Sequence, residues 1–416
     1  MNKIKVVWIC SMSNSRIREK LKYYTWTPIA ILRRLFGKMT MYDLHKWNSN
    51  GIEEFEKFDD IELHIISPHN YISHTQEFEI NGIHYHYIHN ENDNLIDFFK
   101  YHILKKIRTD YRKNAKIICK LIDKINPDLI HIIGAENPEY SQATINISEE
   151  KPIIVSLQTL LIDPIFLKHR PWFENKEAYR VNMESKVIKR ANYIGTKSKH
   201  YMNIIKEKIT PKAQFLEIGL AVEEKAHTID CKKEYDFVYF AKDIEKAIDY
   251  AIEAFALAKN IHPNITLHVV GGYNNTLMDS LRIRMQELGL GNEIDFTGKL
   301  ITHDEVIKEV KKAKFALLPV KADLVSGTIR EAMVNGLPVI TSITPATPLL
   351  NEKRESILLS EKGDFKAMAN NMCRLIEDKE LVYLLQRNAM ETVKERYSNE
   401  AIMKKWKECY YSILSK

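Results

Sequence analysis

Residues 323–338 read DLVSGTIREAMVNGLP and carry the strongest indication of the fold. An apolar run typical of a buried strand, residues 315–320 (FALLPV), comes before them, and Val339 and Ile340 begin another. Residues 328–334 predict a short helix, which the Asn-Gly pair that follows would end. A strand, a polar loop, a short helix and a second strand follow one another directly, which is the local pattern of an α/β sheet.

The beginning of this short helix predicts a site for a negatively charged group. Free backbone N–H groups and the helix dipole favour anions at a helix N-terminus that follows a strand. Two carboxylates, Asp323 and Glu331, flank this N-terminus. The alternative is structural, because Thr328 and Glu331 also have the T-x-x-E spacing of a capping box, in which the Glu331 carboxylate accepts a hydrogen bond from the Thr328 N–H.

Length and composition predict a soluble globular protein of about two domains. The chain has 416 residues, of which 45% are hydrophobic and 28% charged, and its net charge of +6 is a modest excess that fits anionic small molecules as well as a lipid surface. The five cysteines lie far apart without metal-binding spacing, so reduced thiols and a cytoplasmic location are expected. No run approaches the roughly 20 apolar residues of a membrane span.

Apolar runs of strand length recur and alternate with amphipathic stretches, in two series. The first series covers residues 5–10, 61–67, 129–134, 152–157, 193–198 and 214–219. The second covers residues 237–241, 266–272, 293–298, 315–320, 338–342 and 357–360. Residues 80–89 (INGIHYHYIH) alternate apolar and polar side chains and predict a further strand or small hairpin. Near-continuous apolar strands between helices predict parallel sheets, and two series predict two doubly wound, Rossmann-like α/β domains.

The expected first domain covers residues 1–220, and the second covers residues 235–397 after a polar join. A last helix, within residues 398–416, carries four apolar side chains at helical spacing and is expected to pack back on the first domain. Because open α/β sheets bind ligands at the carboxyl ends of their strands, we expect the site to lie in a cleft between the two domains.

Two cations, Lys242 and Lys246, follow the first strand of the second series. Both could reach a diphosphate, and fixed cations would lower the barrier of a reaction in which negative charge grows on a leaving phosphate. The alternative is a solvated helix face, on which Asp243 and Glu245 would be the partners of the two lysines.

The second half of the chain resembles the donor-binding domain of the retaining GT-B glycosyltransferases, glycosyltransferase family four (glycosyl transferases group 1). The resemblance covers residues 237–342 and rests on five segments in order: FVYFAKDIEKAIDYAIEAFALA, ITLHVVGG, GLGNEIDFTGKL, AKFALLPV and DLVSGTIREAMVNGLPVITS. The first half resembles the family only in a general α/β way. The fold implied is GT-B, in which two Rossmann-like domains face a central cleft.

The resemblance also implies roles for individual residues in holding a nucleoside-diphosphate sugar. Lys242 and Lys246 would hold the diphosphate, Glu331 the ribose hydroxyls, and Asp323 the donor sugar near the reacting carbon. Asp323, Lys246 and Glu331 are therefore the expected catalytic residues. The full expected donor-binding set, which adds backbone contacts to the sugar, phosphate and nucleobase, is Lys242, Lys246, Ile294, Asp323, Ser326, Gly327, Thr328 and Glu331.

The sequence departs from the family pattern at several of these places. Asp323 stands where the family has Glu and reaches one methylene less far, and Ser326 stands at a usual glycine. In the first half, Gln158 stands where many relatives carry a His near the reacting sugar. Glu136, Gln158 and Asp163 each follow a strand of the first domain and are the expected acceptor-side residues.

The function implied is transfer of a sugar, with retention of anomeric configuration, from a nucleoside-diphosphate sugar to a glycan or lipid-linked glycan in bacterial surface polysaccharide assembly. No cofactor or metal ion is expected in this hexosyltransferase-type reaction. The alternative is a catalytically silent GT-B subunit that binds a sugar nucleotide or a partner protein. An epimerase would need a proton-abstracting set that the sequence does not show, and no nucleic-acid-reading module is present.

Residues 16–39, from Arg16 to Met39, mix basic with aromatic and aliphatic side chains. Such a mixture suits a helix lying on an anionic membrane and predicts peripheral contact with its inner face. The alternative is a pair of core-facing helices broken at Pro28. The alternating histidines of residues 84–87 (HYHY) are interpreted as a half-exposed strand, and no metal ion is predicted there.

Overall fold

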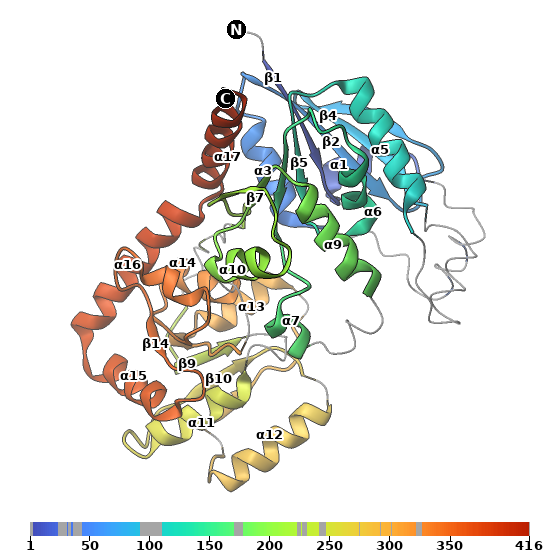
Figure 1. The fold of residues 1–416 in the computed structure, drawn as a ribbon. Coiled ribbons are helices and arrows are strands. Elements are labelled where there is room, and N and C mark those ends of the chain that lie inside the picture. The colour runs from blue at the N-terminus through green and yellow to red at the C-terminus, as the bar shows by residue number, and fades with distance from the viewer. Residues whose placement is uncertain are drawn as a thin grey trace. The chain divides into compact units, whose positions relative to one another are not determined.

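The computed structural model of the chain describes residues 3–23, 31, 35, 44–91, 110–169, 178–222, 226, 231–240, 247–273, 275–291, 293–300, 302–321 and 327–415. The chain divides into two compact units (Figure 1). Unit 1 comprises Met1–Val222 together with Asn399–Lys416, and unit 2 comprises Glu223–Ser398.

Unit 1 is built on a sheet of eight strands, in the order β3-β4-β2-β1-β5-β6-β7-β8. The strands are β1 (Ile4–Ile9), β2 (Ile61–His69), β3 (Gln76–Ile80), β4 (Ile83–His89), β5 (Leu129–Ile133), β6 (Ile153–Ser156), β7 (Tyr193–Gly195) and β8 (Gln214–Leu216). Every neighbouring pair is parallel except β3 and β4, which form an antiparallel hairpin. Its two turn residues, Asn81 and Gly82, both have positive φ, which the hairpin turns that match strand twist require.

The helices of unit 1 join and cover these strands (Figure 1). They are α1 (Ser15–Lys20), α3 (Lys46–Phe55), α5 (Arg112–Ile125), α6 (Pro138–Ser141), the 3₁₀ helix η1 (Gln142–Asn146), α7 (Pro164–His169), α9 (Ala178–Arg190), α10 (Lys199–Lys208) and α17 (Asn399–Leu414). Residues 16–39 suggested membrane contact, and the structure describes only part of them. The described part consists of α1 and the residues to Tyr23, together with Ile31 and Leu35. Within the described part of the chain, no helix combines the length and apolarity needed to cross a bilayer.

The last helix, α17, packs into the core of unit 1, although the rest of that unit comes from the start of the chain. Its apolar residues Ile402, Trp406, Tyr410 and Ile413, which the helical spacing predicted to face the core, are all buried. Trp406 packs edge-on against Trp8 of β1, with ring centroids 5.1 Å apart. The helix is thereby part of the first hydrophobic core.

A buried hydrogen-bonded network fastens α17 to the sheet. The Tyr410 hydroxyl lies 2.9 Å from Nε1 of Trp8, which donates to it, and 2.6 Å from Nδ1 of His131 on β5. Nε2 of His131 lies 2.7 Å from the Ser156 hydroxyl on β6. A neutral imidazole satisfies both contacts, because Nδ1 accepts from Tyr410 while Nε2–H donates to Ser156.

The buried His131 predicts that unit 1 loses stability in acid. Burial lowers the pKa of His131 to about 3 from 6.5, so the unfolded chain takes up this proton first as the pH falls. The free energy of unfolding should therefore decrease by about 1.4 kcal/mol per pH unit as the pH falls from about 6.5 toward 3.

Urea unfolding of unit 1 across this pH range, with His131→Gln compared to the wild type, measures this contribution. The carboxyl groups titrate in both proteins, so only the histidine proton distinguishes them. The variant should show a shallower pH dependence by one proton, and equal slopes in the two proteins would contradict the assignment.

Unit 2 is built on a six-stranded, wholly parallel sheet, in the order β11-β10-β9-β12-β13-β14. The strands are β9 (Tyr235–Phe240), β10 (Leu267–Val270), β11 (Ile294–Phe296), β12 (Ala313–Leu317), β13 (Val339–Ser342) and β14 (Leu358–Ser360). Counted from β9, this is the 3-2-1-4-5-6 order of the doubly wound Rossmann fold. All twelve strands predicted in the two series are present, so the expected pair of parallel-sheet α/β domains is confirmed.

Helices connect the strands of unit 2, and a single hydrophobic core of buried residues runs through it. The helices are α11 (Ile248–Lys259), α12 (Asn275–Glu287), α13 (His303–Val310), α14 (Gly327–Val334), the 3₁₀ helix η3 (Thr347–Asn351), α15 (Phe365–Glu377) and α16 (Lys379–Tyr397). Strands β10 and β13 are buried along their whole length, and β9 and β12 along most of it, as near-continuous apolar runs require when helices pack against them.

Candidate functional site

The topology of unit 2 points to one edge of its sheet as the candidate site. The strand order reverses between β9 and β12, which lie side by side, and ligands of open α/β sheets bind at the carboxyl ends of such a pair. Residues 241–246 follow β9 and residues 318–326 follow β12. Four of the expected donor-binding residues, Lys242, Lys246, Asp323 and Ser326, lie in these connections and are outside the described residues.

Helix α14 follows this edge and carries the rest of the motif. It begins at Gly327, directly after the undescribed residues 322–326, and Thr328 is its second residue. Glu331 lies one turn further on and is only 7% exposed. The helix thus presents its N-terminus, with Gly327 and Thr328, at the end of the sheet where the topology predicts a ligand.

The carboxylate of Glu331 has a partner that sequence reasoning missed. Oε1 of Glu331 lies 2.5 Å from Nε2 of His303, the first residue of α13. Helix α13 starts with a complete capping box, in which the Thr302 hydroxyl accepts from the Glu305 N–H and the Glu305 carboxylate accepts from the Thr302 N–H. The T-x-x-E spacing at residues 302–305 predicts the start of this helix. No local sequence pattern, however, predicts that His303 contacts Glu331 of α14.

Ile294, the expected nucleobase contact, is the first residue of β11 and is buried. Its backbone pairs with Leu267 at the amino end of the strand, whereas residues 297–300 follow at the carboxyl end. The contact between His303 and Glu331 shows that the connection after β11 lies next to α14. Residues 297–300 are therefore better placed than Ile294 to contact a ligand at that edge.

A further cation at this edge, Lys321, was also missed. It follows β12 directly before the undescribed residues 322–326. Its Nζ lies 2.7 Å from Oδ2 of Asp249, in the first turn of α11, and 4.8 Å from the centre of the Tyr250 ring. The ion pair ties the connection after β12 to the helix that follows β9.

Unit 1 brings together two of the three expected acceptor-side residues, Glu136 and Gln158. Glu136 follows β5, and Gln158 follows β6 and donates from Nε2 to the Ile133 carbonyl at 3.1 Å. Gly134 lies between them with φ +98, and a Cβ there would come within 2.9 Å of the Glu136 carboxylate and 3.1 Å of Gln158. Only glycine fits this backbone, because both the φ angle and the neighbours exclude a side chain.

Glu136 is a buried acid whose charge is poorly compensated. Its Oε1 accepts from Nδ2 of Asn137 at 3.0 Å, while its buried Oε2 has no hydrogen-bond partner among the residues that the structure describes. Burial raises the pKa of Glu136 to about 7. Burial also raises the pKa of Glu184 on α9 to about 8, although this carboxylate accepts hydrogen bonds from the backbone of the loop after β6. The amino-acid sequence of α9 does not indicate that Glu184 would be so deeply buried.

Asp163 has a structural environment separate from that pair. Its Oδ1 accepts from the Ile165 N–H at 2.9 Å at the start of α7, and it lies 3.1 Å from Nε2 of His200 on α10. Through these contacts the Asp163 carboxylate holds α7 and α10 together. Of the three expected acceptor-side residues, the structure therefore brings only Glu136 and Gln158 together.

Comparison with known families locates a match in unit 2. Residues 235–378 match the model of the family described as Glycosyl transferases group 1. These residues contain β9 through β14 and helix α14 with Glu331, so the matched segment includes the candidate site.

Two curated proteins match parts of the chain. An exopolysaccharide phosphotransferase of Streptomyces coelicolor is 26% identical over 174 residues, which are 41% of this chain and 18% of that protein. The N-acetyl-alpha-D-glucosaminyl L-malate synthase of Bacillus anthracis is 26% identical over 138 residues, which are 33% of this chain and 34% of that protein. The matches therefore span well under half the length of both relatives.

Among solved structures, sucrose-phosphate synthase from Thermosynechococcus elongatus is similar with a TM-score of 0.65 at 15% sequence identity. The similarity covers 99% of this chain and 100% of that one. A likeness at this identity establishes the fold, and the GT-B architecture expected from the sequence is confirmed.

Proposed function

We propose that this protein transfers a sugar from a nucleoside-diphosphate sugar to a glycan or lipid-linked glycan acceptor, a proposal supported by the match of residues 235–378 to the family model described as Glycosyl transferases group 1. The observation that carries the proposal is the position of Glu331. It lies one turn into α14, beside the carboxyl-end edge of the sheet, within the segment that matches the family. The name of one relative, an exopolysaccharide phosphotransferase, supports a role in bacterial surface polysaccharide assembly.

The donor is held at the N-terminal edge of α14. The ribose hydroxyls donate to the Glu331 carboxylate, and the diphosphate lies against the N–H groups of Gly327 and Thr328 and the cations Lys242 and Lys246. His303 of α13 holds Oε1 of this carboxylate. The backbone of residues 297–300 contacts the nucleobase.

The proposed transfer retains the anomeric configuration and needs neither a metal ion nor a protein nucleophile. The bond between the anomeric carbon and the phosphate oxygen breaks, and the phosphate keeps the electron pair. The acceptor oxygen bonds to the same face of that carbon, and its proton passes to the leaving phosphate. Lys242 and Lys246 stabilise the charge that develops on the phosphate, and Asp323 positions the donor sugar of this hexosyltransferase-type reaction. Glu136, Gln158 and Asp163 belong to the acceptor side.

The enzyme works in the cytoplasm, at the inner face of the membrane that carries its acceptor. The mixture of basic and aromatic residues in residues 16–39 supports this peripheral contact. Flotation with anionic liposomes at low salt tests it: the protein should rise with the vesicles, and its absence from them would refute the contact.

The proposed activity is tested by the release of nucleoside diphosphate from a panel of donor sugars mixed with glycan acceptors. One donor should give release that depends on the acceptor, and release should be lost in Lys246→Ala, Asp323→Ala and Glu331→Ala. A second candidate function, a catalytically silent sugar-nucleotide-binding or partner-binding subunit, is favoured by the shorter Asp323 in place of Glu. Donor binding without any turnover would establish that second function.

Replacement of His303 by alanine should weaken binding of the donor nucleotide by about 5-fold. The His303 imidazole holds one carboxylate oxygen of Glu331. Without the imidazole, the carboxylate must become ordered when the nucleotide binds, which costs about 1 kcal/mol of binding free energy. Isothermal titration with the nucleoside diphosphate measures the change. His262→Ala, which removes a histidine–glutamate pair with Glu377 elsewhere on unit 2, is the matched control. Equal affinities in both variants and the wild type would show that His303 does not orient Glu331.

A further inference from the structure

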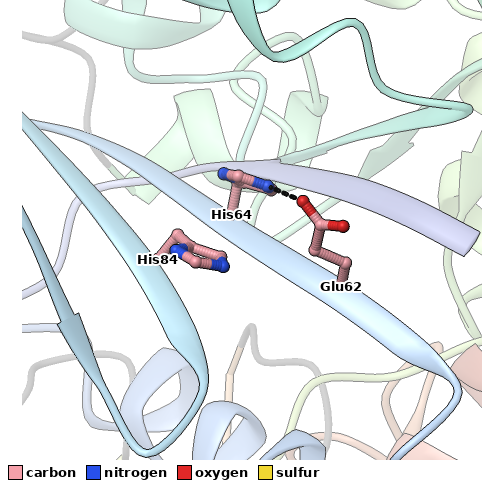
Figure 2. Close-up of side chains that lie close together, drawn as sticks. All are labelled: Glu62, His64 and His84. Carbon is pink, nitrogen blue, oxygen red and sulfur yellow. Dashed lines mark hydrogen bonds and ion pairs between the residues drawn. The ribbon is translucent and has the colours of Figure 1, made fainter. Parts of the chain in front are cut away.

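Strands β2 and β4 of unit 1 bring two histidines and a glutamate together. His64 and His84 are directly paired in register on neighbouring parallel strands, and Glu62 precedes His64 by two residues on the same face of β2. One potential ligand atom from each of these three side chains lies within 4.8 Å of the others. Figure 2 shows the His84 imidazole alongside that of His64, with the Glu62 carboxylate beside them.

The ligand atoms of this cluster lie somewhat further apart than in a coordination sphere, apart from those of His64 and Glu62. Nε2 of His64 lies 2.9 Å from Oε1 of Glu62, and the two imidazole rings are stacked with their centroids 4.6 Å apart. Ligand atoms that share a tetrahedral ion at about 2 Å lie roughly 3.3 Å from one another. Small rotations of the side chains would therefore bring the three atoms around one ion, because the paired strands already fix their Cβ positions.

The outer nitrogen of each histidine faces a second group, as is usual for histidines that bind metals. Nδ1 of His64 lies 3.1 Å from Nε2 of His86, and Nδ1 of His84 lies 3.7 Å from Oε2 of Glu79. These contacts leave Nε2 of each ring for the ion. His86 is 6% exposed, and its own Nδ1, 3.7 Å from Glu77, has no hydrogen-bond partner within the described part of the chain.

We propose that Glu62, His64 and His84 bind a divalent transition-metal ion of the zinc type, which ties β2 to β4. Two imidazole nitrogens and one carboxylate oxygen are a ligand set that suits Zn²⁺ and leaves a fourth position for water. All three residues lie near the amino ends of their strands, whereas Gly134 and Glu136 follow the carboxyl end of the parallel strand β5. The ion therefore lies at the opposite ends of the strands from these residues and takes no part in sugar transfer.

One cation competes with the ion for the carboxylate. Nζ of Lys5 on β1 lies 3.4 Å from Oε1 of Glu62 and donates to the Ile125 carbonyl at 3.3 Å. Lys5 and His64 together satisfy Glu62 when no metal is bound, and metal binding replaces the contact between His64 and Glu62. Removal of the Lys5 charge should accordingly tighten metal binding, whereas removal of a ligand should weaken it.

The sequence alone predicts no metal at the alternating histidines, because the other two ligands come from a strand twenty residues away in the chain. Only the parallel pairing of β2 with β4 places His64 opposite His84.

Isothermal titration of the full-length protein with Zn²⁺ alone, free of any affinity tag, tests the proposal. The wild type should bind one ion at this site with micromolar affinity or better. His84→Ala and Glu62→Gln should each weaken binding by at least about 10-fold, while Lys5→Gln should strengthen it. Both ligand variants alter side chains more than a third exposed, at 38% and 35%, so the fold should survive, which circular dichroism checks.

His74→Ala, which removes an exposed histidine from the same unit, is the matched control and should bind Zn²⁺ like the wild type. Zn²⁺ at about 100 times its dissociation constant should also raise the melting temperature of unit 1 by about 5–10 °C, an increase that His84→Ala abolishes. Absence of Zn²⁺ binding to the wild type, or equal affinity in His84→Ala, Glu62→Gln and His74→Ala, would overturn the proposal.

Discussion

Deletion of Asn399–Lys416 is expected to leave unit 1 unfolded while unit 2 keeps its fold. Helix α17 is the last element of the chain, yet its buried side chains belong to the core of unit 1. Five of them, Ile402, Met403, Trp406, Tyr410 and Ile413, are less than a tenth exposed. Burial of such side chains contributes about 1.5–3 kcal/mol each, or about 10 kcal/mol together, which is comparable with the whole stability of a typical domain.

The deletion also removes the hydroxyl that holds two buried polar groups. Without Tyr410, Nε1 of Trp8 and Nδ1 of His131 would stay buried with no partner, at a cost of about 1–3 kcal/mol each. Tyr410→Phe isolates this part of the effect, because it keeps the ring and removes only the hydroxyl. We expect that variant to fold with a lower unfolding free energy of unit 1.

Calorimetry and near-ultraviolet circular dichroism measure these effects. The truncated chain should show one cooperative transition, that of unit 2, and unit 1 should become sensitive to proteases. A chain ending at Leu414, which lacks only the two residues after α17, is the control and should behave like the full-length protein. A retained transition of unit 1 in the chain without α17 would show that the helix is dispensable.

Replacement of Glu331 by glutamine is expected to weaken donor binding by about 100-fold without unfolding unit 2. Hydrogen bonds to a charged group contribute about 1.5–3 kcal/mol each, and the amide keeps the shape of the side chain but not its charge. The same change removes the charged partner of His303, so α13 and α14 lose one contact between them.

Titration calorimetry with the nucleoside diphosphate, and the rate of its release from the donor sugar, both report the loss. Glu377→Gln, which alters another glutamate of unit 2 paired with a histidine, is the control and should bind and react like the wild type. If Glu331→Gln bound the nucleotide as tightly as Glu377→Gln does, the ribose would have to be held elsewhere.

The strands and their grouping could be predicted because each is a local apolar run. Burial on both faces forces nearly every position of β9, β10 and β13 to be apolar or small, so the signal does not depend on distant partners. The packing of α17 was predictable for the same reason, since its apolar side chains repeat at the helical period.

The contacts that complete each site could not be predicted, because they join residues from separate elements. His303 meets Glu331 only because β11 and β12 end at the same edge of the sheet. Glu184 is fully buried only because α9 covers the loop after β6. The sequence of α9 alone is that of an ordinary polar helix.

Hydrogen-exchange mass spectrometry with the nucleoside diphosphate that gives the largest thermal shift tests whether the donor binds at α14. We expect slower exchange in α14 (Gly327–Val334) and in the connection after β11 that leads to His303, and loss of this protection in Glu331→Gln. Protection confined to unit 1, or no protection with any nucleoside diphosphate, would contradict a donor site at α14.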